Sequence, residues 1–103
     1  MKFVIVTTNR PFGSAKDAED AARRFLELFA KWTPAASTTI HQLVTRVDAG
    51  GGFAVVETDS LADLLDATSK FGVFTDYQIY PVVDTADAIP VAQEAMKFRS
   101  SVS

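Results

Sequence analysis

The sequence predicts an α+β fold in which helices cover one antiparallel sheet, and three observations lead to that class. Short runs rich in β-branched residues alternate with longer segments whose apolar residues recur at helical spacing. Ser14 and Ser60 each begin a Ser-x-x-Asp sequence, which is typical of a helix start. Three glycines at 50–52 separate two strand-like runs by little more than a turn. The elements therefore follow the order strand, helix, strand, strand, helix, strand, helix.

Four runs bounded by turn residues are predicted to be strands. They cover residues 3–8, 38–48, 53–58 and 77–83. The last run contains Pro81, which lacks a backbone donor and therefore belongs in an edge strand. In a βαββαβ arrangement the first and third strands lie inside the sheet, so the sequence predicts a ferredoxin-like fold with the second and fourth strands at the edges.

Three helices are predicted from capping signals and apolar spacing. The first begins at Ser14 and ends at Thr33, because the residue before Pro34 disfavours helical geometry. Its apolar stripe consists of Ala18, Ala21, Ala22, Phe25, Leu28, Phe29 and Trp32. The second runs from Ser60 to Gly72. The third opens at Asp84 or Asp87, and Pro90 favours Asp87 or later because proline is tolerated only in a first turn.

Both faces of the inner strands are apolar. Phe3 and Ile5 alternate with Val4 and Val6 in the first strand, and the third strand shows the same pattern. Helices can cover only one of these faces, so the other needs a second cover. We therefore expect a homodimer in which the two sheets pack face to face.

Composition limits the classes of function. The chain has 103 residues, a mass of 11.2 kDa and a net charge of −3, which fits one domain over residues 1–103 and disfavours nucleic acid and membrane surfaces as partners. The apolar run 3–6 is too short for a signal peptide, so we expect a cytoplasmic protein. One histidine and no cysteine cannot build a zinc site within one chain, and no metal or cofactor is expected.

His41 and Glu57 are the candidate catalytic residues. If Val47 pairs with Phe53, His41 shares a face with Glu57, diagonal to it and opposite Asp59. A carboxylate that orients an imidazole forms a general base. A turn with an even number of residues would separate the pair. The alternative is structural: His41 makes an ordinary edge-strand hydrogen bond, and Glu57, which we expect to be partly buried, pairs with another side chain or a backbone donor, Lys2 and Arg46 being the charged candidates.

Trp32, Tyr77 and Tyr80 are the candidate ligand-binding residues. Tyr77 and Tyr80 differ in parity and should point to opposite faces of their strand, and Trp32 lies on the apolar stripe of the first helix. The structural interpretation, which these patterns favour, is a core or interface position for each of them. We expect a small hydrophobic ligand in a pocket between sheet and helices. A cofactor-independent isomerase, cyclase or monooxygenase using His41 or Glu57 as base is one alternative, and a non-catalytic dimerisation module is another. A cavity of roughly 300 Å³ or more that touches His41 or Glu57 would distinguish a ligand-binding protein or enzyme from a non-catalytic dimerisation module.

Five segments carry a resemblance that covers nearly the whole chain. They are Met1-Lys2-Phe3-Val4-Ile5, Phe29-Ala30-Lys31-Trp32, Thr39-Ile40-His41-Gln42, 51–59 and Tyr80-Pro81-Val82-Val83-Asp84. In order and spacing they resemble the domain of unknown function 3303 family, which is itself similar to the dimeric α+β barrel superfamily. The resemblance implies a dimeric barrel and brings no activity, because members of that superfamily place unrelated chemistry on one fold.

Overall fold

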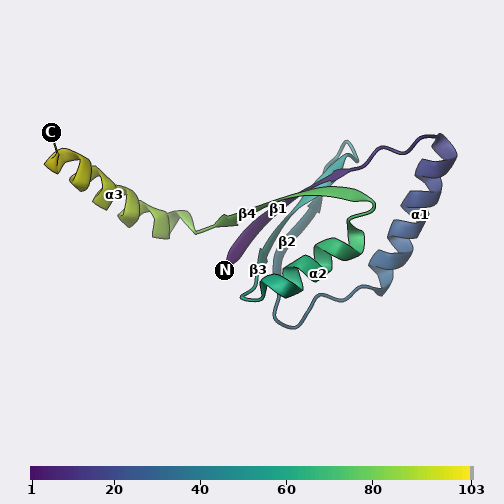
Figure 1. Cartoon of the computed structure of the whole chain (residues 1–103), viewed down its shortest axis with the longest axis horizontal. Coiled ribbons are helices and arrows are strands. Elements are labelled where there is room, and N and C mark those ends of the chain that lie inside the picture. The colour runs from purple at the N-terminus through teal and green to yellow at the C-terminus, as the bar shows by residue number, and fades with distance from the viewer. Residues whose placement is uncertain (103) are drawn as a thin grey trace.

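The computed structural model describes residues 1–102 and confirms the predicted order of elements. In chain order (Figure 1) these are β1 (Lys2–Asn9), α1 (Ala15–Lys31), β2 (Thr39–Thr45), β3 (Gly51–Glu57), α2 (Leu61–Phe71), β4 (Thr75–Val82) and α3 (Thr85–Ser101). The sheet order is β2-β3-β1-β4, and all three neighbouring pairs are antiparallel. The ferredoxin-like arrangement is therefore present, with Pro81 in the edge strand β4.

The starts of α1 and α2 lie where the capping signals predict. The Oγ of Ser14 accepts a hydrogen bond from the backbone N–H of Asp17 at 3.1 Å, and the Oγ of Ser60 accepts one from Asp63 at 3.2 Å. Each bond satisfies a backbone donor that the first helical turn leaves free. These local bonds explain why short sequence signals locate the helices correctly.

The start predicted for α3 at Asp87 or later is wrong. The helix begins after Asp84, and the backbone N–H groups of Asp87 and Ala88 both donate to the Asp84 carbonyl. Pro90 consequently lies inside the helix, where it lacks the N–H that would reach the carbonyl of Ala86. The free-energy cost of this one missing hydrogen bond is therefore smaller than the stabilisation from continuing the helix through Pro90.

The core lies between the sheet and the helices α1 and α2. Its buried apolar side chains come from β1, β3 and α2: Phe3, Ile5, Ala54, Val56 and Leu64. Beside this core, aromatic rings whose centroids lie 5.5–6.2 Å apart connect α1 with α2 and with the segment that follows α2. These rings belong to Phe25, Phe29, Trp32, Phe71 and Phe74. No residue of α1 is fully buried, and Ala18 and Ala22 of the predicted stripe are exposed. The chain by itself therefore has a small core.

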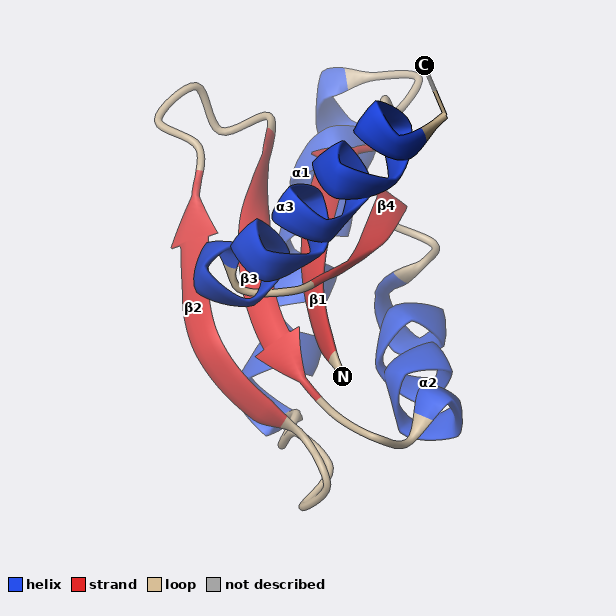
Figure 2. Ribbon diagram, turned by 90° about the vertical axis from the view of Figure 1, so that its left-hand side faces the viewer, coloured by secondary structure: helices blue, strands red, loops and turns tan. Residues whose placement is uncertain are grey.

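The opposite side of the sheet, here called the open face, is not covered by α1 or α2. Figure 2 shows α1 behind the sheet and α3 in front of it. The apolar side chains of this face form what we call the open-face patch: Val4, Val6, Val44, Phe53, Val55 and Tyr80. Phe53 and Tyr80 are 43% and 50% exposed. Aromatic residues usually bury most of their area, so this face is suited to a further contact.

α3 projects from the rest of the chain. Its ribbon continues away from the end of β4 in Figure 1, and the molecule measures 63 × 30 × 21 Å. The radius of gyration is 18.3 Å, whereas a compact domain of this length has one of about 13 Å. No residue of α3 is buried. Within residues 1–102, no helix combines the length and apolarity needed to cross a membrane.

Candidate functional site

A β-bulge in β2 decides where His41 points. The condition for a shared face, pairing of Val47 with Phe53, is not met, because Val44 pairs with Phe53 and the connecting segment has an even number of residues. With that register alone, His41 would lie opposite Val56 and face the core. The register shifts by one between Ile40 and Gln42, which leaves His41 as an extra residue. The bulge therefore returns the imidazole to the open face.

His41 and Glu57 are in direct contact there. The imidazole Nε2 lies 2.8 Å from Oε1 of Glu57, with the two side chains 43% and 52% exposed. Thr39 lies directly opposite Glu57, and His41 is not paired with Asp59 as the predicted register would require. An ionised carboxylate only accepts hydrogen bonds, so we assign the Nε2–H tautomer, which leaves the lone pair on Nδ1. The pair has the composition of a general base.

Glu57 is exposed, contrary to the expectation of partial burial. Its alternative partners are engaged elsewhere: Arg46 pairs with Asp48, and Lys2 pairs with Asp84. The strand that carries Glu57 is central, but its side chain lies on the open face. A place in an inner strand therefore does not bury the Glu57 side chain, because the face on which it lies is uncovered.

Lys2 and Asp84 extend the charged group across the sheet. The Nζ of Lys2 donates to Oδ1 of Asp84 at 2.6 Å, and Lys2 lies opposite Glu57 in the β1–β3 register. The hydrogen bond from Lys2 lowers the pKa of Asp84, with a smaller contribution from the charge of His41, and the bond to Asp84 raises the pKa of Lys2. His41, Glu57, Lys2 and Asp84 thus form a row, called here the charged row, that spans the sheet at one end of the open face.

A pocket of about 490 Å³ adjoins this row. Its walls come from the ends of β1, β3 and β4 and from the first turn of α3: Met1, Lys2, Glu57, Pro81, Val82, Val83, Asp84 and Asp87. The volume exceeds the roughly 300 Å³ that ligand pockets require, and Glu57 is part of the lining. Apolar side chains and carboxylates share the walls.

The five residues predicted from the sequence do not form one site. Tyr80 pairs with Val4 and lies on the open face, where His41 and Glu57 also lie. Tyr77 pairs with Thr7 and packs against the core, and burial raises its pKa. Trp32 lies between α1 and α2, where its ring packs edge-on against that of Phe71 with the ring centroids 5.6 Å apart. The prediction that the two tyrosines face opposite sides is confirmed, and the sheet separates Trp32 and Tyr77 from the charged row.

Of the residues that line the pocket, sequence reasoning named only Glu57 as a site residue and missed the three other charged side chains, those of Lys2, Asp84 and Asp87. Lys2 was considered only as a partner for Glu57, although it shares parity with Val4 and Val6, which places it on the open face. Asp84 and Asp87 join the pocket only because α3 begins at Thr85, and nothing in the sequence indicated that start over a later one. Among residues 1–102, no three histidine, cysteine or acidic side chains lie together as a metal-binding group.

Comparison with known proteins places the chain in a family. A search of curated proteins finds no match. The family model described as "Domain of unknown function (DUF3303)" matches residues 1–96, which include the four strands, α1, α2, the charged row and most of α3. Because this match covers nearly the whole chain, the protein belongs to the DUF3303 family.

Proposed function

We propose that this protein is a homodimer that binds a small, largely apolar molecule at the charged end of its open face. The observation that carries the proposal is the pocket of about 490 Å³ lined by Glu57, Lys2 and Asp84 together with apolar residues. A pocket that combines an apolar wall with a few convergent polar groups is the usual form of a small-molecule site.

The charges of the pocket favour a ligand with a hydrogen-bond donor at its polar end. Three carboxylates line it, those of Glu57, Asp84 and Asp87, against the ammonium of Lys2 and the N-terminal ammonium of Met1, which is paired with Asp59 outside the lining. Ionised carboxylates accept hydrogen bonds and attract cations. An amine or hydroxyl group therefore fits better than a carboxylate. Val82, Val83 and Pro81 would contact the apolar part of the ligand.

The homodimer rests on the uncovered apolar surface. The accessible surface of the chain is 7618 Å², whereas a compact monomer of this mass exposes about 5,700 Å². The excess of about 1,900 Å² lies within the area that each partner buries in obligate dimers, roughly 1,000–2,500 Å². The open-face patch supplies a contiguous part of that surface.

Paired amphiphiles test the ligand proposal. We would add hexylamine or hexanoate to ¹⁵N-labelled protein and follow amide chemical shifts. Hexylamine should shift the signals of Lys2, Glu57 and Val82, and hexanoate should shift them much less. Equal or larger shifts with hexanoate would refute the donor assignment. Shifts confined to Trp32 and Tyr77 would place the ligand between sheet and helices, and no shift with either probe would favour a non-catalytic dimerisation module.

A second candidate function is supported by the contact between His41 and Glu57. A neutral imidazole oriented by a carboxylate abstracts a proton from carbon next to a carbonyl group, and can return it to another carbon. In this reading Nδ1 of His41 takes the proton and Glu57 stabilises the imidazolium that forms. The reaction is an isomerisation that needs no cofactor.

Hydrogen–deuterium exchange tests this second function without knowledge of the substrate. Phenylacetone in D₂O exchanges the hydrogens next to its carbonyl slowly, and NMR follows the loss of their signal. The protein should accelerate the exchange at least tenfold over buffer, and His41→Ala should abolish the acceleration. An acceleration that survives His41→Ala would exclude His41 as the base.

A further inference from the structure

We infer that α3 is an exchanged arm, which packs on the body (residues 1–84) of a second copy of this chain. The inference rests on the homodimer proposed above and adds which segment crosses between the protomers. Three observations carry it: the apolar surface of α3, the way α3 is attached, and its position relative to the open face.

The apolar side chains of α3 lie on two sides of the helix. Four of them are at least half exposed, Ile89, Val91, Met96 and Phe98, and Val102, directly after the helix, is exposed as well. Ile89 and Met96 are seven residues apart and share one side, as do Val91 and Phe98. Val91 follows Ile89 by two residues, about 200° around the helix axis, so the two pairs lie on nearly opposite sides. A helix that is apolar on two sides is suited to burial between other elements.

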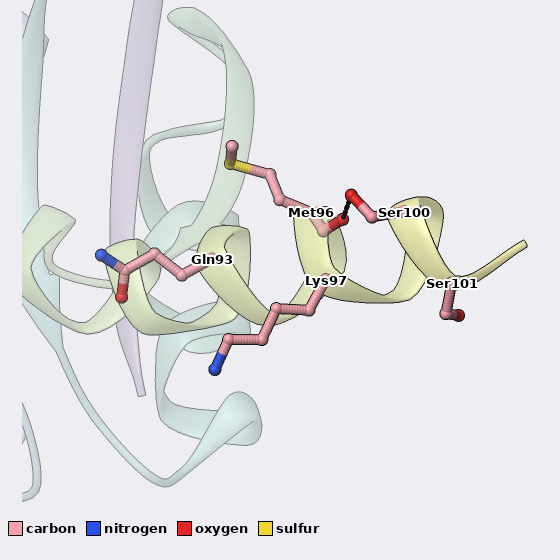
Figure 3. Close-up of a pocket in the computed structure, with 5 residues that line it drawn as sticks. All are labelled: Gln93, Met96, Lys97, Ser100 and Ser101. Atoms are coloured by element: carbon pink, nitrogen blue, oxygen red, sulfur yellow. Dashed lines mark hydrogen bonds between the residues drawn. The ribbon is translucent and has the colours of Figure 1, made fainter. Parts of the chain in front are cut away.

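Within residues 1–102, no other element supplies a second wall for this surface. A depression of about 530 Å³ along α3 is lined by Gln93, Met96, Lys97, Ser100 and Ser101, all from the one helix. Figure 3 shows the side chains of Met96 and Lys97 extending from different sides of α3. A contact surface formed by a single helix is completed when another element lies along it.

The short connection between β4 and α3 determines the direction in which α3 extends. Only Val83 and Asp84 separate β4 from α3, and Asp84 is held to β1 by the ion pair with Lys2. The helix starts at once, since Asp87 and Ala88 donate to the Asp84 carbonyl. A connection this short sets the direction of α3, which leads away from its own body (Figure 1).

Position identifies a second copy as the partner. α3 and the open face of the sheet lie on the same side, opposite α1 (Figure 2), and the strand register places the open-face patch on that face. In a two-fold dimer each chain offers the same surface, so one partner covers both the patch and the arm, and receives the same cover in return. Exchange of an identical element between protomers is a low-cost route to such a dimer. The excess accessible surface described above is the amount that one such interface removes.

Crosslinking between isotopically distinct chains tests the exchange. The chain has no cysteine, so Met96→Cys introduces the only thiol, which is labelled with a benzophenone maleimide. This chain is refolded with an equal amount of ¹⁵N-labelled wild type and irradiated. Crosslinks from α3 should join peptides of different isotope content in amounts comparable to like-isotope pairs, with residues 1–84 as targets. Leu26→Cys on α1, which is 64% exposed, serves as the control and should give few such pairs.

The outcomes distinguish the exchange of α3 from dimerisation itself. A dimeric mass by light scattering with crosslinks only inside one chain would overturn the exchange and leave the homodimer standing. A monomeric mass at micromolar concentration would overturn both, and the hexylamine experiment would still decide the pocket.

Charge substitutions provide an independent measurement. Met96→Glu and Phe98→Glu replace side chains that are 58% and 70% exposed, so they should leave the circular dichroism spectrum unchanged. Each should raise the dimer dissociation constant at least tenfold. Leu26→Glu is the matched control and should change it less than twofold. An unchanged dissociation constant in both α3 variants would overturn the inference.

Discussion

Nε2 of His41 lies 2.8 Å from Oε1 of Glu57 only because β2 carries one more residue than β3 at that point. Both side chains are about half exposed, so the contact contributes little to stability, in the range of surface ion pairs, about 0–1 kcal/mol. Its consequence is chemical: it orients the imidazole and selects which nitrogen carries the proton.

Glu57→Ala should change the tautomer of His41. In the wild type, the neutral imidazole should be mainly the Nε2–H form, and removal of the carboxylate should increase the Nδ1–H form. Two-dimensional ¹H–¹⁵N spectra of the ring nitrogens measure this directly. The free energy of unfolding should change by less than about 1 kcal/mol. An identical tautomer ratio in the variant would show that Glu57 does not orient the ring.

The ion pair between Lys2 and Asp84 should make stability depend on pH at the acid end. The folded-state pKa of Asp84 is lowered by Lys2, so the stabilising contribution is present above the unfolded pKa of about 3.9 and is lost as pH falls through the folded value. Urea unfolding from pH 7 down to pH 2 should show the wild type more stable than Asp84→Asn at neutral pH, with the two curves converging in acid.

Two controls accompany this measurement. Asp84 makes no side-chain capping bond to α3, so Asp84→Asn tests the ion pair and not the cap. Lys2→Met should reproduce the effect of Asp84→Asn at pH 7. A difference between wild type and Asp84→Asn that persists at pH 2 would point to a cause other than this pair.

Tyr77 should ionise above its ordinary range, because burial raises the pKa of its phenol. A raised folded pKa means that the contribution to stability is full below the unfolded pKa of about 10 and is lost as pH rises through the folded value. The difference in absorbance titration between wild type and Tyr77→Phe measures this group alone. Tyr77→Phe should leave the hexylamine shifts unchanged, since the sheet lies between Tyr77 and the charged row.

Gly51 should not tolerate alanine. Its φ of 151° lies in a region that residues with a Cβ rarely adopt, and a Cβ there would come within 1.9 Å of the Thr7 carbonyl oxygen. Gly51→Ala should destabilise the protein by about 2–4 kcal/mol, measured by urea unfolding. Gly13→Ala is the matched control, because its nearest neighbour to a Cβ is 3.9 Å away, and it should change stability little.

Ala49→Gly in the same hairpin should stabilise the protein. Ala49 has a φ of 61°, a left-handed conformation that glycine adopts without penalty. Relief of this strain should add about 0.5–1 kcal/mol to the free energy of unfolding, less what glycine gains in the unfolded chain. A destabilised Ala49→Gly variant would contradict the strain argument.

The elements that the sequence predicted correctly depend on local interactions. Ser14 and Ser60 cap their helices through residues three positions away, and Pro81 marks an edge strand through its own missing donor. The register of β2 depends on a bulge at His41, which no short-range signal identifies. The position of α3 depends on its attachment at Asp84, which no sequence signal indicated over a later start. The candidate pair was therefore found through the wrong register, and the pocket beside it was not found.

The single tryptophan lies in the helix layer and so provides a reporter for one half of the molecule. Trp32 contacts Phe29 and Phe71 on the side of the sheet away from α3. Its fluorescence follows packing of α1 on α2, and events on the open face reach it only through the sheet. A dilution series that dissociates protomers without changing this emission would therefore mean that each body keeps its helix layer as a folded monomer.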